Sequence, residues 1–334
     1  MRILVISPSF FGYEQAIVDA FRARGHTVEL VDDRPSNRPL KRALVRVAPW
    51  VMRRATDSHY RAAARREASG RFDGVLVVKG EVVPDWFLRD LRSSNPEAIF
   101  VYYTYDSVSN SPQGQRLLSH FDRRFSFDPV DVDSNPGFEL MHLFFGASYR
   151  PSGEHRDLDI SFVGTLHGDR YRLVQAISRD IPTGRKRLYF YMPARWYFWL
   201  RKLLSKDVRA VGRKEVSFRP LSTADVVSIA QRSRVVIDIQ RHGQSGLTMR
   251  TFEALATGAA LITTNDSVRN LPFYDEKSIL IVPRDANRVD STEVASFVNR
   301  QPTTALPPET IQPYSLDRWA DRILNAFEMR GEAR

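Results

Sequence analysis

Short apolar segments alternate with amphipathic helical segments along this chain, and no other feature of the sequence constrains the fold as strongly. Helical periodicity covers residues 15–24 and the segment after Pro84, and Gly25 marks the end of the first helix. Strands that are joined through helices run parallel, so this order predicts an α/β fold whose mostly parallel sheet is covered on both faces. In the first half, buried strands are predicted at 2–7, 27–31, 74–78, 99–103 and 125–127, the last of that half.

A second alternating series follows a polar segment with proline and glycine at 149–157, which suits a connection between domains. The chain's 334 residues also exceed the usual size of a single core. We therefore predict two doubly wound halves that face each other across a cleft, divided between residues 150 and 151. The second half is predicted to have strands at 159–163, 187–191, 234–239, 260–263 and 279–282, a loop at 164–169, and helices at 171–178, 223–231 and around Arg250.

The last segment, 315–329, is predicted to be an amphipathic helix that follows several prolines. Such a helix needs a surface on which to dock its apolar stripe. The stripe consists of Leu316, Trp319, Ile323, Leu324 and Phe327.

Several classes of protein are excluded by what the chain lacks. It has no cysteine, which excludes disulfides, zinc–thiolate sites and thiol nucleophiles. Residues 1–7 are too short an apolar run for a secretory leader, and no segment approaches the roughly 20 apolar residues of a membrane-spanning helix. We therefore expect a soluble, cytoplasmic protein.

The net charge of +10 is concentrated in two stretches. Residues 34–66 contain ten Lys or Arg against one acid, and residues 185–214 again contain ten against one. The second stretch interleaves its cations with seven aromatic residues. This pattern suits an anionic membrane surface, single-stranded nucleic acid, or an ordinary core beneath solvated arginines, and the sequence leaves all three open.

Residues 246–264, GLTMRTFEALATGAALITT, place a cation and a carboxylate at helical spacing before a buried strand. Arg250 and Glu253 are three residues apart and project from one face of the predicted helix, which Gly258 ends. Such a pair near a helix start suits a ligand that carries both phosphate and sugar hydroxyls. An ordinary surface ion pair explains the spacing equally well.

A second candidate phosphate site is the strand, glycine turn and helix of SFVGTLHGDRYR, residues 161–172. Gly164 would let a phosphate approach the backbone, Thr165 and the helix-start amides would bind its oxygens, and Arg170 or Arg172 would neutralise it. The alternative is a plain strand-to-helix turn. His242 is either a phosphate or sugar contact or a solvated loop histidine, and no metal-ligand spacing accompanies it.

Candidate acid–base residues follow the strands of the first half, at the sheet edge where such folds bind ligands. Asp106 comes after the strand 99–103 and is predicted either to act as a general base or hold a sugar hydroxyl, or to form a helix cap or turn. Glu81 is a second candidate of the same kind. Asp128, which precedes Pro129, is predicted to be a turn residue.

Taken together, these segments resemble the GT-B glycosyltransferases, in particular the bacterial group-1 branch that includes the CgeB-like proteins. The resemblance covers 159–264 best, and it is carried by SFVGT, the strand 234–239, and Gly246, Arg250, Phe252, Glu253 and Gly258. It implies an acceptor-binding domain at 1–150, a nucleotide-sugar domain at 151–312, and a helix at 313–334 that crosses back onto the first domain.

The resemblance also implies roles for single residues. Glu253 would hold the ribose hydroxyls of a nucleotide sugar and Arg250 its diphosphate. Gly164 and Thr165 would line the facing edge, and Arg170, His242, Gly246 and Thr248 would complete the donor site. Many retaining relatives have a second glutamate where this chain has Ser245, so the stereochemical course stays open.

We therefore predict a metal-independent glycosyltransferase that needs no cofactor beyond its nucleotide-sugar co-substrate. It would transfer a hexosyl or related sugar to a hydroxyl of a surface-polysaccharide or lipid-linked glycan, with Asp106 as the base if the reaction inverts configuration. The stretches 34–66 and 185–214 would hold it on the inner face of the cell membrane. A nucleotide-sugar epimerase on the same scaffold is one alternative, and a nucleic-acid-binding protein is another that the lack of a recognised module disfavours.

Overall fold

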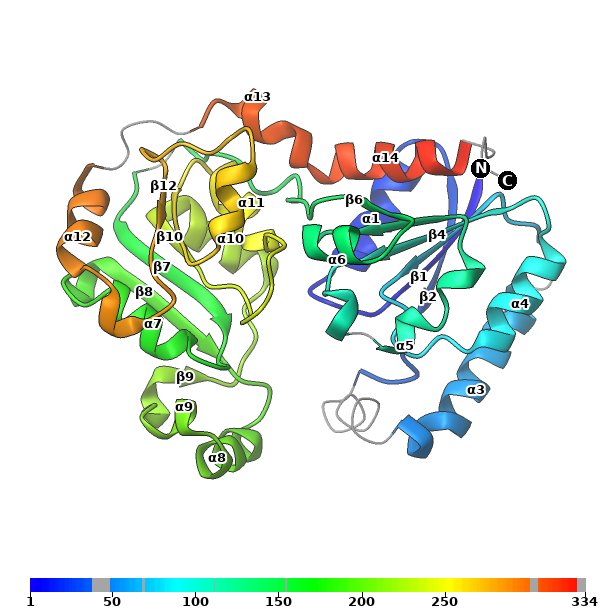
Figure 1. Cartoon of the computed structure of the whole chain (residues 1–334), viewed down its shortest axis with the longest axis horizontal. Helices are drawn as coiled ribbons and strands as arrows, with labels where there is room; N and C mark the ends of the chain where they lie inside the picture. The colour runs from blue at the N-terminus through cyan, green and yellow to red at the C-terminus, as the bar shows by residue number, and fades with distance from the viewer. Residues whose placement is uncertain (38–48, 68–69, 111, 154, 301–305, 329–334) are drawn as a thin grey trace. The chain divides into compact units, whose positions relative to one another are not determined.

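The structure, a computed structural model, describes residues 1–37, 49–67, 70–110, 112–153, 155–300 and 306–328. It divides the chain into unit 1, Met1–His142 with Leu316–Arg334, and unit 2, Leu143–Ser315 (Figure 1). The divisions fall a few residues from those that the sequence predicts, at 142/143 rather than 150/151 and at 315/316 rather than 312/313. In the basic stretch 34–66, residues 38–48 lie outside the described residues.

Unit 1 is built on a parallel sheet in the order β2-β1-β3-β4-β5-β6. Its strands are β1 Arg2–Ser7, β2 Thr27–Asp32, β3 Gly74–Val78, β4 Ile99–Thr104, β5 Arg123–Ser126 and β6 Phe138–Leu140. The prediction that β5 is the last strand of this half is wrong, because β6 pairs with it in parallel. A strand of three residues is too short to give a periodic signal in the sequence.

Helices cover the sheet of unit 1, and the C-terminal helix is one of them. They are α1 Tyr13–Arg22, α3 Pro49–Glu67, α4 Asp85–Ser94, α5 Pro112–Gln115, α6 Pro129–Ser134 and α14 Leu316–Glu328. Helix α14 packs against α1 and β4 (Figure 1), and its Trp319 meets Tyr103 edge to face with ring centroids 5.0 Å apart. Arg24 at the end of α1 pairs with Asp317 at 3.1 Å and with Asp321 at 2.7 Å. Four residues of the apolar stripe, Trp319, Ile323, Leu324 and Phe327, are thus buried within unit 1, and Leu316 is half-buried.

Unit 2 has a second parallel sheet, in the order β12-β11-β10-β7-β8-β9. Its strands are β7 Leu158–Thr165, β8 Lys186–Tyr191, β9 Val216–Ser217, β10 Ser233–Asp238, β11 Ala260–Thr263 and β12 Ile279–Ile281. Gly164 and Thr165 belong to β7 and pair with Phe190 and Tyr191 of β8, so the loop predicted from residue 164 begins only after Thr165. Gly164 has no side chain and therefore interrupts the apolar pattern of the sequence. Backbone pairing with β8 nevertheless continues the strand through Thr165.

The helices of unit 2 include four that the periodicity did not predict, α8, α9, α12 and α13. All of them are α7 Arg170–Ile177, α8 Arg195–Leu204, α9 Lys206–Arg209, α10 Thr223–Arg232, α11 Met249–Ala256, α12 Ser291–Arg300 and α13 Pro308–Ile311. A capping box between Ser222 and Asp225 begins α10. Gly258, with φ +75°, follows α11 as the sequence predicts, because this backbone conformation strains any residue with a Cβ.

Short 3₁₀ helices join several of these elements, and each unit has its own aromatic core. The 3₁₀ helices are η1 Val108–Asn110, η2 Leu118–His120, η3 Thr183–Arg185, η4 Arg213–Glu215, η5 Asp266–Asn270, η6 Ala286–Arg288 and η7 Gln312–Tyr314. Tyr60, Phe87 and Phe100 are fully buried in unit 1, and Phe190 and Phe198 are fully buried in unit 2. In the part of the chain that the structure describes, no helix is long and apolar enough to cross a bilayer.

Candidate functional site

In unit 2, the start of α11 is tied to the end of β10 by a buried carboxylate. Asp238, the last residue of β10, accepts hydrogen bonds from the hydroxyls of Thr248 and Thr251, each at 2.7 Å. Thr248 occupies the position before α11 but turns its hydroxyl to Asp238 instead of capping the helix. The first turn of α11 is therefore fixed at the carboxyl edge of the sheet, where parallel sheets bind ligands.

Arg250 and Glu253 form the ion pair that their spacing predicts, but it is not a surface pair. Nη1 of Arg250 lies 3.1 Å from Oε2 of Glu253, whose side chain is only 1% exposed, whereas that of Arg250 is 21% exposed. The Tyr149 hydroxyl lies beside both, and its pKa is raised by burial and by the Glu253 carboxylate. A buried carboxylate held by an arginine and a tyrosine has a fixed direction, as a group that recognises hydroxyls requires.

Arg170 lies at the same edge of the sheet, close to other cationic side chains. Burial lowers the pKa of its guanidinium to about 10. The carboxylates of Asp238 and Asp169 act to raise this pKa, whereas the charges of Arg241 and Arg284 lower it further. Its Nη1 makes a long 3.4 Å contact to the Thr165 carbonyl, and its Nε has no hydrogen-bond partner among the described residues. A half-buried guanidinium with a buried, unpartnered Nε would gain from an anion nearby.

Two of these cations, Arg241 and Arg284, were not among the candidates from sequence. Arg284 donates to both carboxylate oxygens of Asp169, at 2.9 and 2.8 Å, and to the Gln240 carbonyl at 3.0 Å. It follows β12 at the carboxyl edge, and this position was the only signal in the sequence that pointed to it. His167 lies in the same surroundings, where burial and the neighbouring arginines lower its pKa to about 3, so it is neutral.

The remaining donor-site candidates occupy the loop between β10 and α11. His242 is exposed there, next to Arg241. Gly246 is buried, and its carbonyl accepts hydrogen bonds from Gln244 at 2.8 Å and Asn265 at 3.2 Å. At Gly164, a Cβ would come within 2.6 Å of the Phe162 ring, so the absence of a side chain serves packing there. The role of these residues toward a ligand stays a prediction.

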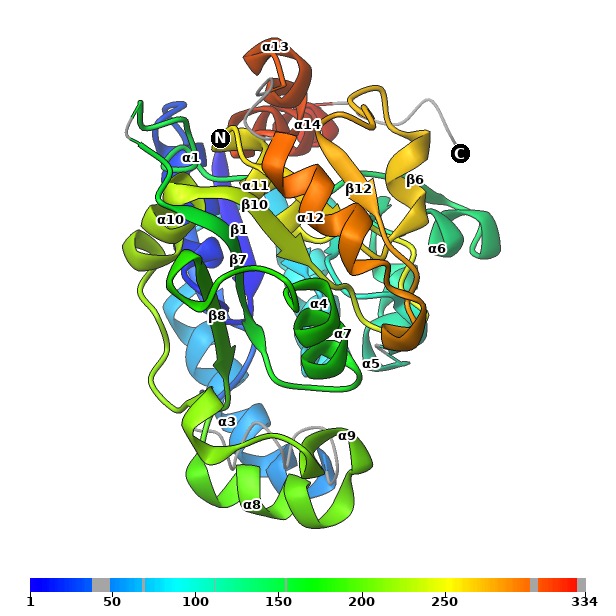
Figure 2. The same cartoon turned by 90° about the vertical axis from the view of Figure 1, so that its left-hand side faces the viewer.

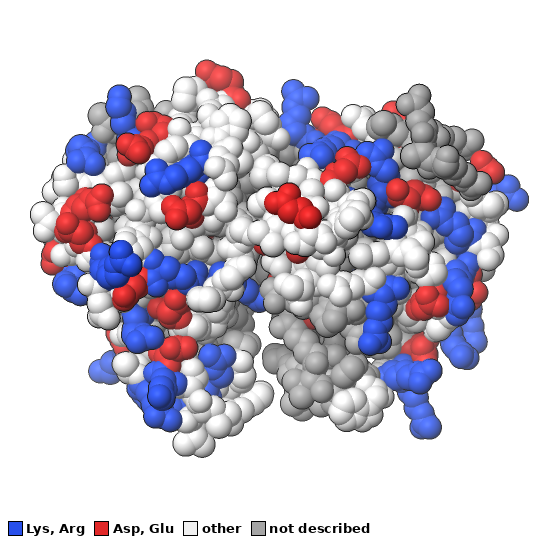
Figure 3. All heavy atoms as spheres, viewed as in Figure 1, with Lys and Arg blue, Asp and Glu red and all other residues white. Residues whose placement is uncertain are grey.

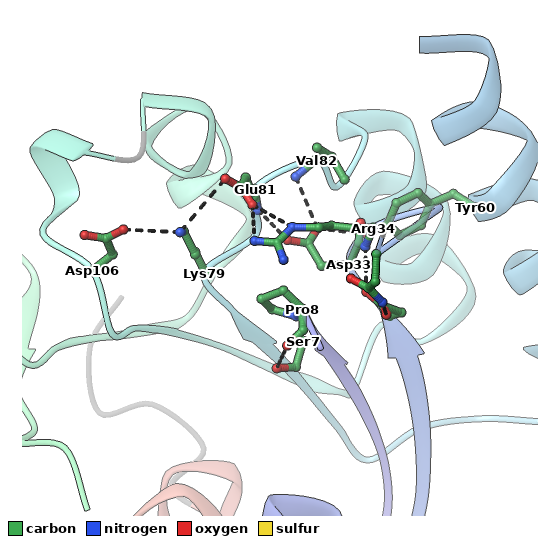
Figure 4. Close-up of polar contacts among 11 residues, drawn as sticks. Ser7, Pro8, Asp33, Arg34, Tyr60, Lys79, Glu81, Val82 and Asp106 are labelled. Carbon is green, nitrogen blue, oxygen red and sulfur yellow. Dashed lines mark hydrogen bonds and ion pairs between the residues drawn. The ribbon is translucent and has the colours of Figure 1, made fainter. Parts of the chain in front are cut away.

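Unit 1 carries a buried ionic network at the carboxyl ends of β2, β3 and β4 (Figure 4). Lys79, which has φ +70°, places its Nζ 3.2 Å from Asp106 and 3.9 Å from Glu81. Arg34 donates to Glu81 from Nε at 2.8 Å. The Asp106 carboxylate pairs with Lys79. Asp128, predicted as a turn residue, caps α6 by accepting a hydrogen bond from Val130 N–H. Glu81 and Asp106 therefore belong to one cluster.

Asp33, which was not among the candidates from sequence, holds the backbone beside this network in place. It is fully buried and accepts hydrogen bonds from the backbone N–H groups of Glu81 at 2.7 Å and Val82 at 3.1 Å, and from the Tyr60 hydroxyl at 3.2 Å. Burial, opposed by the two backbone N–H groups, raises its pKa to about 6. Asp33 thus fixes the turn that carries Lys79 and Glu81. No group of three His, Asp or Glu side chains within the described ranges could hold a metal ion.

The raised pKa of Asp33 predicts a pH-dependent stability. The native state binds this proton more tightly than the unfolded chain, so the contribution of Asp33 to stability falls by about 2–3 kcal/mol as pH rises from about 4 to about 6. Urea unfolding at several pH values should show this loss in the native protein and not in Asp33→Asn. Asp19→Asn, an exposed carboxylate on α1, is the control and should keep the native pH profile. Identical profiles for Asp33→Asn and the native protein would contradict the assignment.

Two parallel six-stranded α/β units, the first completed by the C-terminal helix, define the GT-B fold. Residues 170–306, which form most of unit 2, match the family described as glycosyl transferase-like. The chain therefore has the GT-B fold, and its residues 170–306 are similar to a glycosyltransferase family. A search of curated proteins by sequence gives no match, and the CgeB-like branch stays a prediction.

Solved structures agree with this fold. Sucrose-phosphate synthase from Thermosynechococcus elongatus is similar with a TM-score of 0.66 and 12% identity, over 98% of both chains. Anabaena HepE in complex with UDP-glucose is similar with a TM-score of 0.64 and 12% identity, over 98% of this chain and 99% of HepE. UDP-GlcNAc 2-epimerase from Neisseria meningitidis is similar with a TM-score of 0.56 and 10% identity, over 98% of this chain and all of the epimerase. At these identities the likeness establishes the fold and nothing about the substrate.

Proposed function

We propose that unit 2 binds a nucleotide sugar and that the enzyme transfers its sugar to a hydroxyl of a surface-polysaccharide or lipid-linked glycan. The observation that carries this proposal is the cluster of Arg241 and Arg284 around half-buried Arg170, whose buried Nε has no hydrogen-bond partner among the described residues. The Arg250–Glu253 pair begins the neighbouring helix, so diphosphate-binding and hydroxyl-binding groups occur together. The complex of HepE with UDP-glucose supports a uridine nucleotide as the first donor to test.

In the proposed reaction, the acceptor oxygen attacks the anomeric carbon and the bond from this carbon to the diphosphate oxygen breaks. Arginine side chains of unit 2 stabilise the negative charge that develops on the leaving nucleoside diphosphate, and no metal ion is required for this. Unit 1 binds the acceptor, and Asp106 accepts the proton of its hydroxyl if the reaction inverts configuration. Lys79 compensates the charge of Asp106 and holds it in one orientation.

Epimerisation of the nucleotide sugar is the second candidate, since an epimerase has the same fold. The two reactions differ in their need for an acceptor. A transferase releases nucleoside diphosphate in proportion to the glycan acceptor supplied, whereas an epimerase converts the sugar without one. The family match of unit 2 supports transfer.

A thermal-shift screen of nucleotide sugars tests the donor site. At about 100 times its dissociation constant, the donor should raise the melting temperature by about 5 °C, because it binds only the folded state. UDP-glucose and UDP-GlcNAc begin the screen, and the free sugars serve as controls that should have no effect. Product analysis with and without glycan acceptor then separates transferase from epimerase. Failure of every nucleotide sugar and nucleoside diphosphate to shift the melting temperature would refute the proposal.

A further inference from the structure

Helix α8 presents large apolar side chains to solvent along one face. Trp196, Trp199, Leu200 and Leu203 stand at positions i, i+3, i+4 and i+7 and are 54%, 56%, 42% and 72% exposed. Leu204 extends this face and is 71% exposed. We call these five residues the α8 stripe. The apolar face of a surface helix normally turns toward the core, so this orientation needs a reason.

The opposite face of α8 fixes the helix in this orientation. Phe198 is fully buried in the core of unit 2, where its ring lies 6.1 Å from that of Phe218. Lys202 donates to the Val211 carbonyl at 2.9 Å. The stripe cannot turn inward without withdrawing Phe198. Figures 1 and 2 both show α8 and α9 projecting beyond the sheet of unit 2, below β8.

Cations flank the stripe along the sequence. Between residues 195 and 214 the one acid is Asp207, and it is already paired with Arg172 at 3.3 Å. Figure 3 shows Lys and Arg beside uncharged surface at the lower left, where α8 and α9 lie. The cations of this segment are Arg195, Arg201, Lys202, Lys206, Arg209, Arg213 and Lys214. An apolar stripe with a cationic border is complementary to a surface that is anionic outside and apolar beneath.

We propose that α8 lies in the interface of an anionic lipid bilayer, with the α8 stripe among the acyl chains and the cations at the headgroups. Tryptophan suits this depth, and an amphipathic helix with leucine and tryptophan on one face binds in the plane of the membrane. A second copy of the chain would bring like charges together. Single-stranded nucleic acid would use the rings but leave the three leucines exposed. The inference rests on the proposed function in one respect, that a lipid-linked acceptor would lie at this surface.

Flotation with vesicles tests the inference without donor or acceptor. The full chain should bind vesicles of phosphatidylglycerol and phosphatidylcholine and not phosphatidylcholine alone, and part of the binding should persist at about 0.5 M salt, because insertion is not screened. The double variant Trp199→Ser/Leu203→Ser should bind at least about tenfold more weakly. Val130→Ser, which alters a 55% exposed apolar side chain of unit 1, is the matched control and should bind normally.

A membrane contact elsewhere on the chain, or a different ligand on the α8 stripe, would give distinguishable results. Trp50→Ser changes the 73% exposed tryptophan of α3, and a loss of binding in this variant alone would move the contact to unit 1 and overturn the inference. Tighter binding of an oligothymidine than of vesicles, or a stripe-dependent dimer in light scattering, would also overturn it. Unchanged donor affinity in the double variant, measured by calorimetry, keeps this result separate from the donor-site proposal.

Discussion

Replacing Glu253 by glutamine is expected to weaken nucleotide-sugar binding by about 100-fold. Charge-assisted hydrogen bonds from two ribose hydroxyls to the carboxylate contribute about 1.5–3 kcal/mol each, and the neutral amide retains only part of this. The substitution preserves side-chain volume, which matters because Glu253 is buried. Arg250→Ala should weaken donor binding further and abolish it, since it removes a cation for the diphosphate. Isothermal calorimetry with the nucleotide sugar measures both effects.

The matched control is Asp266→Asn. Asp266 pairs with Arg269 at the same i,i+3 spacing in unit 2, but both side chains are exposed. This variant should leave donor affinity unchanged, because an exposed pair of this kind contributes little. If Glu253→Gln and Arg250→Ala bind the donor as tightly as the native protein while remaining folded, the donor-site assignment is wrong.

Replacing Asp106 by asparagine is expected to lower kcat by about 10²- to 10⁴-fold, the range that a general base contributes. Donor affinity should not change, because Asp106 belongs to unit 1 and the proposed donor residues to unit 2. The buried Lys79 keeps Glu81 as a partner at 3.9 Å, which limits the structural damage. Steady-state release of nucleoside diphosphate in the presence of acceptor measures the effect.

Asp19→Asn is the control for this second prediction, since it removes an exposed carboxylate paired with Arg22 on the same unit. It should leave kcat unchanged. A loss of less than about twofold in Asp106→Asn would exclude Asp106 as the base, and it would favour a retaining course in which no protein base of this kind acts.

Local patterns in the sequence predicted most of the fold. The glycine after α11, the helix α10 and the strand at β10 each depend on residues within a few positions, so they can be recognised from the sequence alone. The short strand β6 and the extension of β7 through Thr165 were missed, because each is fixed by pairing with a neighbouring strand. Strand pairing between residues 14 or more positions apart leaves no local signal in the sequence.

The ionic networks of both sites were harder to predict for the same reason. Arg284 meets Asp169 across 115 residues, and Arg34 meets Glu81 across 47. These side chains come together because parallel strands end at one edge of a sheet, and the order of the strands decides which loops are neighbours. Asp106 and Glu81 could be named as candidates from their positions after strands, but their common partner Lys79 could not.

The sequence by itself determined that the chain forms two α/β units and that Arg250 and Glu253 share a helix face, because periodicity and spacing are local properties. Only the tertiary structure decided which faces are covered. It buried Glu253 and turned the α8 stripe outward, although both helices are amphipathic by the same criterion. Spacing fixes which side chains lie together on a helix, whereas burial depends on what long-range packing brings against that face.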